Sequence, residues 1–164
     1  MKRNLLPLMF FAAFALLAIA IVVDCVRLAD DARARVQLAD QELQKHEDRL
    51  AVLLAASPAA TPEVQDAITN FRAAQDPQSR RDAYQAMVST FQQTMAGQLD
   101  ATNPIARKFM DDTAGAINRH QVAEKPYDEE QSAYQKYLAS WRGQIAQWFS
   151  SIARADRIRA EVAD

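Results

Sequence analysis

The stretch "VRLADDARARVQLADQELQKHEDRLAVLLAA", residues 26–56, repeats its apolar residues at two positions of a seven-residue period. Two interleaved rows carry the repeat: Ala29, Val36, Leu43 and Leu50 in the first, and Ala32, Ala39, His46 and Leu53 in the second. This spacing over nearly four heptads predicts one long helix with a single packing face, as in a coiled coil or a bundle. We expect Ser57-Pro58 to end the helix, since a residue before proline disfavours the helical backbone.

Composition around this stretch favours helices throughout. The chain has 164 residues with only 3 glycines and 6 prolines, and strand formers are few outside the apolar N-terminus. Setting that N-terminus aside leaves about 140 residues, enough for one ordinary domain. The net charge is −2 and no basic tract is present, which argues against a nucleic-acid partner. The one cysteine, Cys25, excludes an intramolecular disulfide.

The N-terminal 25 residues have the pattern of a membrane anchor. Residues 5–23 contain no charge, and 19 helical residues rise about 28 Å, close to the hydrocarbon thickness of a bilayer. We therefore predict a transmembrane signal anchor over residues 1–25. A signal peptide cleaved after Ala20 is the first alternative, and a lipoprotein acylated at Cys25 is the second, although Asp24 is a poor residue before an acylated cysteine.

Charges flanking this segment predict its orientation. Lys2 and Arg3 precede it and favour a cytoplasmic N-terminus. Arg27, Arg33 and Arg35 follow it and favour the opposite orientation. We expect the N-terminus inside and the domain on the outer side of the cytoplasmic membrane.

Three polar residues followed by proline predict three further helix starts. The pairs are Thr61-Pro62, Asp76-Pro77 and Asn103-Pro104, each a capping residue before a proline at the first helical position. The stripes expected to be buried are Val64, Ile68 and Phe71, then Tyr84, Met87, Val88, Phe91 and Met95, then Ile105, Phe109, Ala116 and His120.

The C-terminal third reads as one long helix from Tyr127 to about residue 160. One row repeats by seven through Tyr134, Trp141, Trp148 and Ala155, and the adjacent row holds Leu138, Ile145 and Ile152. Pro126 precedes it without an intervening polar loop, which favours a kink or brief break at Lys125 in an almost continuous helix. The alternative is a corner between two helices, because proline and acidic residues also start helices.

These segments together predict an all-α protein: an N-terminal transmembrane helix followed by an elongated antiparallel bundle of four, or up to five, helices over residues 26–164. The connections are short, as bundles use. Self-association through the heptad seam is compatible with this architecture.

Three segments resemble the LemA family of bacterial membrane-anchored proteins. Residues 43–54, "LQKHEDRLAVLL", are similar to the family's Leu-x-Arg-Arg-x-Asp-Leu-Ile-Pro-Asn-Leu-Val signature. Residues 68–74, "ITNFRAA", are similar to its Val-Thr-x-Ala-Arg-Ala segment. The spacing of its Asn-Arg…Tyr-Asn-Glu…Tyr-Asn segment is kept by Asn118, Arg119, Tyr127, Glu129 and Tyr134.

The chain also departs from that pattern. His46 stands in place of the second arginine, Leu50-Ala51-Val52 replaces the Ile-Pro-Asn run, and Gln135 replaces the second asparagine. The resemblance implies a membrane anchor at residues 1–25 and a LemA-like bundle at 26–164. The family has no generally established enzymatic activity, so the resemblance implies fold and anchoring and little about function. Our first hypothesis for the function is a non-enzymatic interaction or scaffolding module at the bacterial cell envelope, in the inner membrane with the bundle on the periplasmic or extracellular side.

Candidate sites are few. We identify no catalytic residue, cofactor site or metal site. His46 lies on the heptad seam one turn after Glu42, and a metal site there would need His120 or acids from a facing helix. This leaves a small-ligand or metal-responsive sensor near His46 as the alternative function, and a hydrogen-bonded core histidine as the simpler reading.

Three late aromatic residues are the candidate partner surface: Trp141, Trp148 and Phe149. The two tryptophans keep the phase of the seam, which favours core packing for them. If Phe149 lies outside the core, the three could instead form a protein contact.

Overall fold

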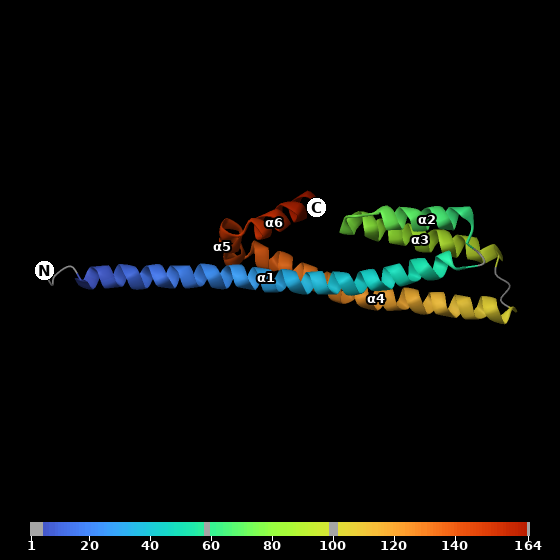
Figure 1. Cartoon of the computed structure of the whole chain (residues 1–164), viewed down its shortest axis with the longest axis horizontal. Helices are drawn as coiled ribbons and strands as arrows, with labels where there is room; N and C mark the ends of the chain where they lie inside the picture. Colours follow the sequence, from blue (N-terminus) through green and yellow to red (C-terminus); the bar gives the residue numbers. More distant parts are fainter. Residues whose placement is uncertain (1–4, 58–59, 99–101, 164) are drawn as a thin grey trace. The chain divides into compact units, whose positions relative to one another are not determined.

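The computed structural model describes residues 5–57, 60–98 and 102–163, with side chains at 9–57, 60–94 and 102–157. These residues form helices and no strands, so the all-α prediction is confirmed. The helices are α1 (Leu5–Ala55), α2 (Pro62–Ala73), α3 (Pro77–Gln98), α4 (Pro104–Ala139), α5 (Trp141–Phe149) and α6 (Ser151–Ala163), shown in Figure 1.

The chain divides into two compact units, and each has its own apolar cluster. Unit 1 comprises residues 1–40 and 126–164, and unit 2 comprises residues 41–125. Helices α1 and α4 each run through both units, because the divisions fall inside them. A long helix with a continuous apolar stripe can supply residues to successive cores along its length.

Unit 2 is built on the stripes that the sequence predicts. Val64, Ile68 and Phe71 of α2 are buried, and they share a cluster with Tyr84, Met87 and Phe91 of α3, Ala116 of α4, and Leu50, Ala51 and Leu54 of α1. The rings of Phe71 and Tyr84 meet edge to face across the α2–α3 hairpin, with centroids 6.2 Å apart. The prediction for Ile105 is wrong, since its side chain is 73% exposed; Ala106 is buried instead.

Capping explains where α3 and α4 begin. The backbone N–H of Ser79 donates to Asp76 Oδ1 (2.9 Å), and the N–H of Ile105 donates to Asn103 Oδ1 (2.9 Å). These bonds occupy amide groups that lack partners in the first turn of a helix. The Asp76 carboxylate has a pKa below its ordinary value, because Ser79 hydrogen bonds to its charged form. Thr61 occupies the N-cap position of α2, but its hydroxyl makes no capping bond.

Pro126 lies inside α4, so the continuous reading is confirmed and the two-helix corner is wrong. A proline cannot donate to the carbonyl four residues earlier, here that of Val122. Both residues are exposed, and water can therefore replace the missing donor.

The predicted single helix over 127–160 is wrong, because the chain leaves the helical conformation at Ser140 and again at Ser150. Both residues are extended, with φ/ψ of −74°/163° and −119°/116°. The Ser140 hydroxyl accepts from the backbone N–H of Gly143 at 3.2 Å, and the Ser150 hydroxyl accepts from the N–H of Ala153 at 3.3 Å. Each serine thus caps a new helix, and α4, α5 and α6 replace one element.

Unit 1 packs the two short helices against α1 through small residues. Its buried cluster consists of Cys25, Ala29, Tyr134, Leu138, Ala146 and Ala153. The Arg33 guanidinium of α1 lies 2.9 Å from Asp156 Oδ2 of α6, and that carboxylate also accepts from the Tyr134 hydroxyl of α4 at 2.8 Å. One carboxylate thereby joins three helices.

The apolar part of α1 is uncovered. Its large side chains Phe10, Phe11 and Phe14 are 71–74% exposed, and only 6% of its most apolar stretch is buried. A core helix of a soluble domain would be covered by its neighbours. Among the described residues, one helix is long and apolar enough to cross a membrane, and this helix is α1.

Candidate functional site

A buried ionic cluster joins three helices of unit 2. Glu47 of α1 is 3% exposed and His120 of α4 is 5% exposed. Arg80 Nε of α3 lies 2.6 Å from Glu47 Oε2, and His120 Nε2 lies 3.3 Å from Glu47 Oε1. A buried carboxylate requires such partners, because removal from water disfavours its charge. We call Glu47, Arg80, Tyr84 and His120 the Glu47 cluster.

Aromatic contacts enclose this cluster. The Tyr84 ring stacks on the His120 imidazole, with centroids 3.9 Å apart and planes 19° apart. The Arg80 guanidinium lies 4.9 Å from the centroid of Phe71, a cation–π geometry. Arg80 also reaches outward, where Nη2 lies 3.0 Å from the exposed Asp48 carboxylate. The guanidinium therefore bridges a buried acid and a solvent-exposed one.

The Tyr84 hydroxyl differs from its neighbours in the cluster. It is buried and has no hydrogen-bond partner among the residues that the structure describes. Burial, then the nearby charges of Glu47 and Glu124, raise the pKa of Tyr84 well above its ordinary value. The neutral phenol is thus strongly favoured in the folded state.

Replacing Tyr84 with phenylalanine should leave the free energy of unfolding at neutral pH nearly unchanged. In alkali, the variant should lose less of this free energy than the wild-type chain does. An unfolded tyrosine ionises near pH 10, while the folded one keeps its proton. Stability linked to Tyr84 is therefore fully present below about pH 10 and is lost as the pH rises further. Urea unfolding of the chain at pH 7 and at about pH 11 measures both effects.

The matched control is Tyr134→Phe, which removes a hydroxyl that does have an acceptor in Asp156. This variant should lose about 1 kcal/mol at neutral pH. Equal alkaline losses in the wild-type chain and the Tyr84→Phe variant would contradict the role assigned to Tyr84.

The histidine chosen from sequence is not the one in the cluster. His46 is half-buried, and the neighbouring residue Glu47 is the group that pairs with His120. Glu42 interacts with Lys45 on the exposed side of α1, and this contact lowers the pKa of Glu42. A signal for Glu47 was available, since it lies four residues after Leu43 and three before Leu50, two buried residues.

The interactions that the Glu47 cluster makes are an ion pair between Glu47 and Arg80 and a contact between Glu47 and the His120 ring. Within the part of the chain that the structure describes, no three His, Cys, Asp or Glu side chains are placed to hold a metal ion. The cluster's clearest effect is to hold α1, α3 and α4 in one register, because a buried charge without its partners is costly.

A second candidate surface lies on α5. Trp141, Trp148 and Phe149, the aromatic face, are 60%, 76% and 65% exposed. The expectation of core packing for the tryptophans is therefore wrong. Ser140 interrupts the helix one residue before Trp141, so the buried positions of α5 become Gly143 and Ala146. The residues named as a candidate partner surface are exposed, as such a surface requires.

Within the part of the chain that the structure describes, the fold defines a helical-bundle protein whose N-terminal helix α1 is long and apolar enough to cross a membrane. Comparison with protein-family models, with curated proteins and with solved structures finds no match to this chain.

Proposed function

We propose that this chain is a single-pass, membrane-anchored helical bundle that acts as a non-enzymatic interaction or scaffolding module at the bacterial cell envelope. The resemblance to the LemA family, in residues 43–54, 68–74 and 118–134, supports the anchored helical bundle in this proposal and adds little about its role. The proposed location is the inner membrane, with the bundle on the periplasmic or extracellular side.

The observation that carries this proposal is the continuity of α1. This helix contains the uncovered apolar segment and then supplies Cys25 and Ala29 to the core of unit 1. It continues to supply Leu50, Ala51 and Leu54 to the core of unit 2. The proposed anchor and the α1 residues of each core thus belong to one helix. A module that presents a surface at a membrane gains from such a connection.

Protease accessibility tests the membrane placement. The full chain with a C-terminal tag is followed in intact cells, spheroplasts and lysed membranes. We expect digestion in spheroplasts and not in intact cells. Protection until lysis would place the bundle in the cytoplasm and reverse the proposed orientation.

Photocrosslinking tests the scaffolding role. A photoreactive residue at Val52 or Val122, which are 61% and 67% exposed, should give discrete adducts in cells. The matched control is the same residue at Leu50, which is fully buried and should give none. A chain that is monomeric in mild detergent and yields no adduct from either exposed position would count against a scaffold.

A small-ligand or metal-responsive sensor near His46 is the second candidate. Its motive is that His46 is half-buried and precedes Glu47, which pairs with the second histidine, His120; a metal would still need ligands beyond these, since the described residues hold no group of three His, Cys, Asp or Glu side chains placed for one. Zinc should then raise the melting temperature of the wild-type chain by mass action and leave that of His46→Gln unchanged. No shift in the wild-type chain would exclude zinc sensing.

A further inference from the structure

The aromatic face is an apolar surface on a helix whose opposite side is already packed. Trp141 and Trp148 are seven residues apart and lie on the same side of α5, with Phe149 adjacent. Gly143 and Ala146 occupy the other side and are buried. Three large aromatic side chains exposed on one short helix are a candidate contact surface.

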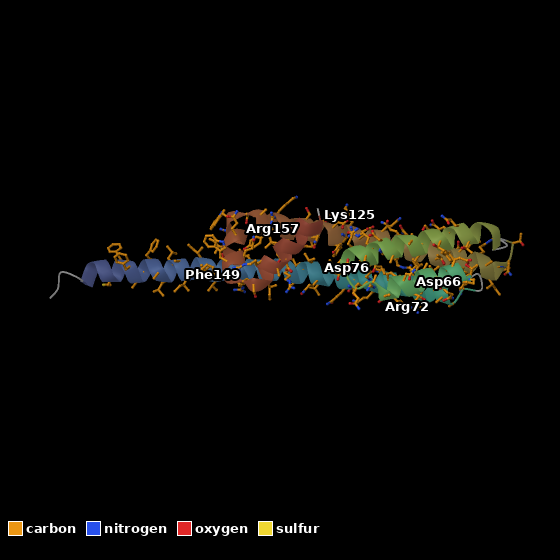
Figure 2. All side chains as sticks on the ribbon, turned by 90° about the horizontal axis from the view of Figure 1, so that it is seen from above. Asp66, Arg72, Asp76, Lys125, Phe149 and Arg157 are labelled. Atoms are coloured by element: carbon orange, nitrogen blue, oxygen red, sulfur yellow. The ribbon has the colours of Figure 1, made fainter. Side chains whose placement is uncertain are left out.

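Helix α5 packs on the part of α1 that directly follows the uncharged run of residues 5–23. Ala146 of α5 belongs to the same buried cluster as Cys25 and Ala29, and the Tyr137 hydroxyl, just before α5, donates to the Cys25 carbonyl at 2.6 Å. Figure 1 shows α5 beside this part of α1. Figure 2 shows Phe149 on the side of α5 that faces the apolar, N-terminal end of α1. All of these residues belong to unit 1.

Helix geometry sets the depth of this contact. Cys25 lies two residues beyond Val23, the last residue of the uncharged run, which is a rise of about 3 Å. The headgroup region on each side of a bilayer is roughly 5–8 Å thick. If α1 spans the membrane, Cys25 and the helix packed on it therefore lie at headgroup depth.

The chemistry of the aromatic face suits that depth. Tryptophan concentrates at membrane–water interfaces, where its ring is apolar and its N–H can still meet polar groups. Basic side chains flank the face: the Arg142 guanidinium lies 5.3 Å from the centroid of Trp141, and Arg154 donates to the carbonyl oxygens of Gln147 and Trp148. Guanidinium groups at the surface attract anionic lipid phosphates. Asp24 of α1, which precedes Cys25 in the sequence, is an acidic residue on the same part of α1.

We propose that the aromatic face of α5 inserts into the headgroup region of the bilayer that α1 enters, giving the chain a second attachment to the membrane. This inference rests on the proposed membrane anchor. It assigns the candidate partner surface to lipid, and the bundle surface of unit 2 is left for protein partners.

Tryptophan fluorescence tests the proposal, because Trp141 and Trp148 are the two tryptophans of the chain. The full chain is reconstituted into vesicles of phosphatidylcholine with phosphatidylglycerol. Lipids brominated near the headgroup should quench most of the emission, which should be blue-shifted and protected from acrylamide. Trp141→Phe and Trp148→Phe report each position separately.

The matched control places the only tryptophan of the chain at another exposed site of unit 1, on α1 and away from the membrane. Leu38→Trp, in a chain carrying Trp141→Phe and Trp148→Phe, places tryptophan at a site that is 63% exposed. This site lies about 22 Å beyond Val23. Its emission should be red-shifted, open to acrylamide and unaffected by brominated lipid.

Other outcomes separate the two proposals. Emission from Trp141 and Trp148 that stays open to acrylamide in membrane-bound chain would overturn lipid insertion and leave the anchor intact. Blue-shifted emission without quenching by brominated lipid would overturn it in favour of a protein cover, such as a second copy. A chain that fails to float with the vesicles would overturn the anchor and this inference with it.

Discussion

Replacing Gly143 with alanine should open the corner between α4 and α5 and destabilise this part of unit 1 by about 3 kcal/mol. A Cβ at this position would overlap the carbonyl oxygen of Tyr137 and lie 2.6 Å from the Cα of Leu138. These are backbone atoms, so a side-chain rotation cannot relieve the overlap. Helix α5 would have to move off the buried cluster that contains Cys25 and Ala146.

Hydrogen exchange with mass spectrometry measures this effect locally, which matters because two units need not unfold together. Amide groups of α5 should exchange roughly 100-fold faster in the variant. The control is Gly115→Ala in α4, whose Cβ would meet only the Arg119 side chain at an ordinary 3.5 Å. That change should stabilise α4 by about 0.5–1 kcal/mol, since glycine is a poorer helix residue than alanine. Unchanged exchange in α5 of Gly143→Ala would contradict the tight corner.

Glu47→Gln should destabilise unit 2 by about 3 kcal/mol. The substitution keeps the shape of the side chain and removes the negative charge of the Glu47 carboxylate, which both Arg80 and His120 contact. The Arg80 side chain, only 21% exposed, would lose its buried partner. Breaking a buried ion pair is costly because the remaining charge stays away from water.

The matched control is Asp48→Asn, which removes the other carboxylate bound by the same guanidinium. The Asp48 side chain is 66% exposed, so this change should cost less than about 1 kcal/mol. Urea unfolding of both variants in mild detergent, with the wild-type chain, gives the comparison. Similar losses for the two variants would show that burial does not distinguish the two carboxylates.

Local sequence signals determined where α2, α3 and α4 begin. Pro62, Pro77 and Pro104 open α2, α3 and α4 at the residues predicted, since proline fits the first helical position and lacks only an amide that would be unpaired there. The α2 stripe is buried as its spacing predicts, and so are Tyr84, Met87 and Phe91 of the α3 stripe; Val88 is partly buried, and the Met95 side chain lies outside the described residues. The uncharged run of residues 5–23 lies in α1, the helix that among the described residues is long and apolar enough to cross a membrane. Each of these signals lies within one helix and needs no knowledge of its neighbours.

The heptad rows show where local signals stop. They placed His46 on the packing face, while Glu47 is the residue that enters the interior. A glutamate is placed in the interior only when a basic residue from another helix can meet it, here Arg80, 33 residues further along the chain. No spacing within residues 26–56 specifies that partner.

Only the tertiary structure decided that the helix after Tyr127 breaks at Ser140 and at Ser150. Heptad spacing continues through Ser140 and Ser150, so periodicity alone extends the helix. Serine occurs both inside helices and at helix caps, and the free energy of folding differs between the two positions by about 1 kcal/mol. Packing of Ala146 and Ala153 on the Cys25 cluster outweighs that difference, and breaking the helix exposes Trp141 and Trp148. The sequence by itself determined the helices and the apolar segment; contacts between distant residues decided which side chains face water, because burial depends on what the rest of the chain brings alongside.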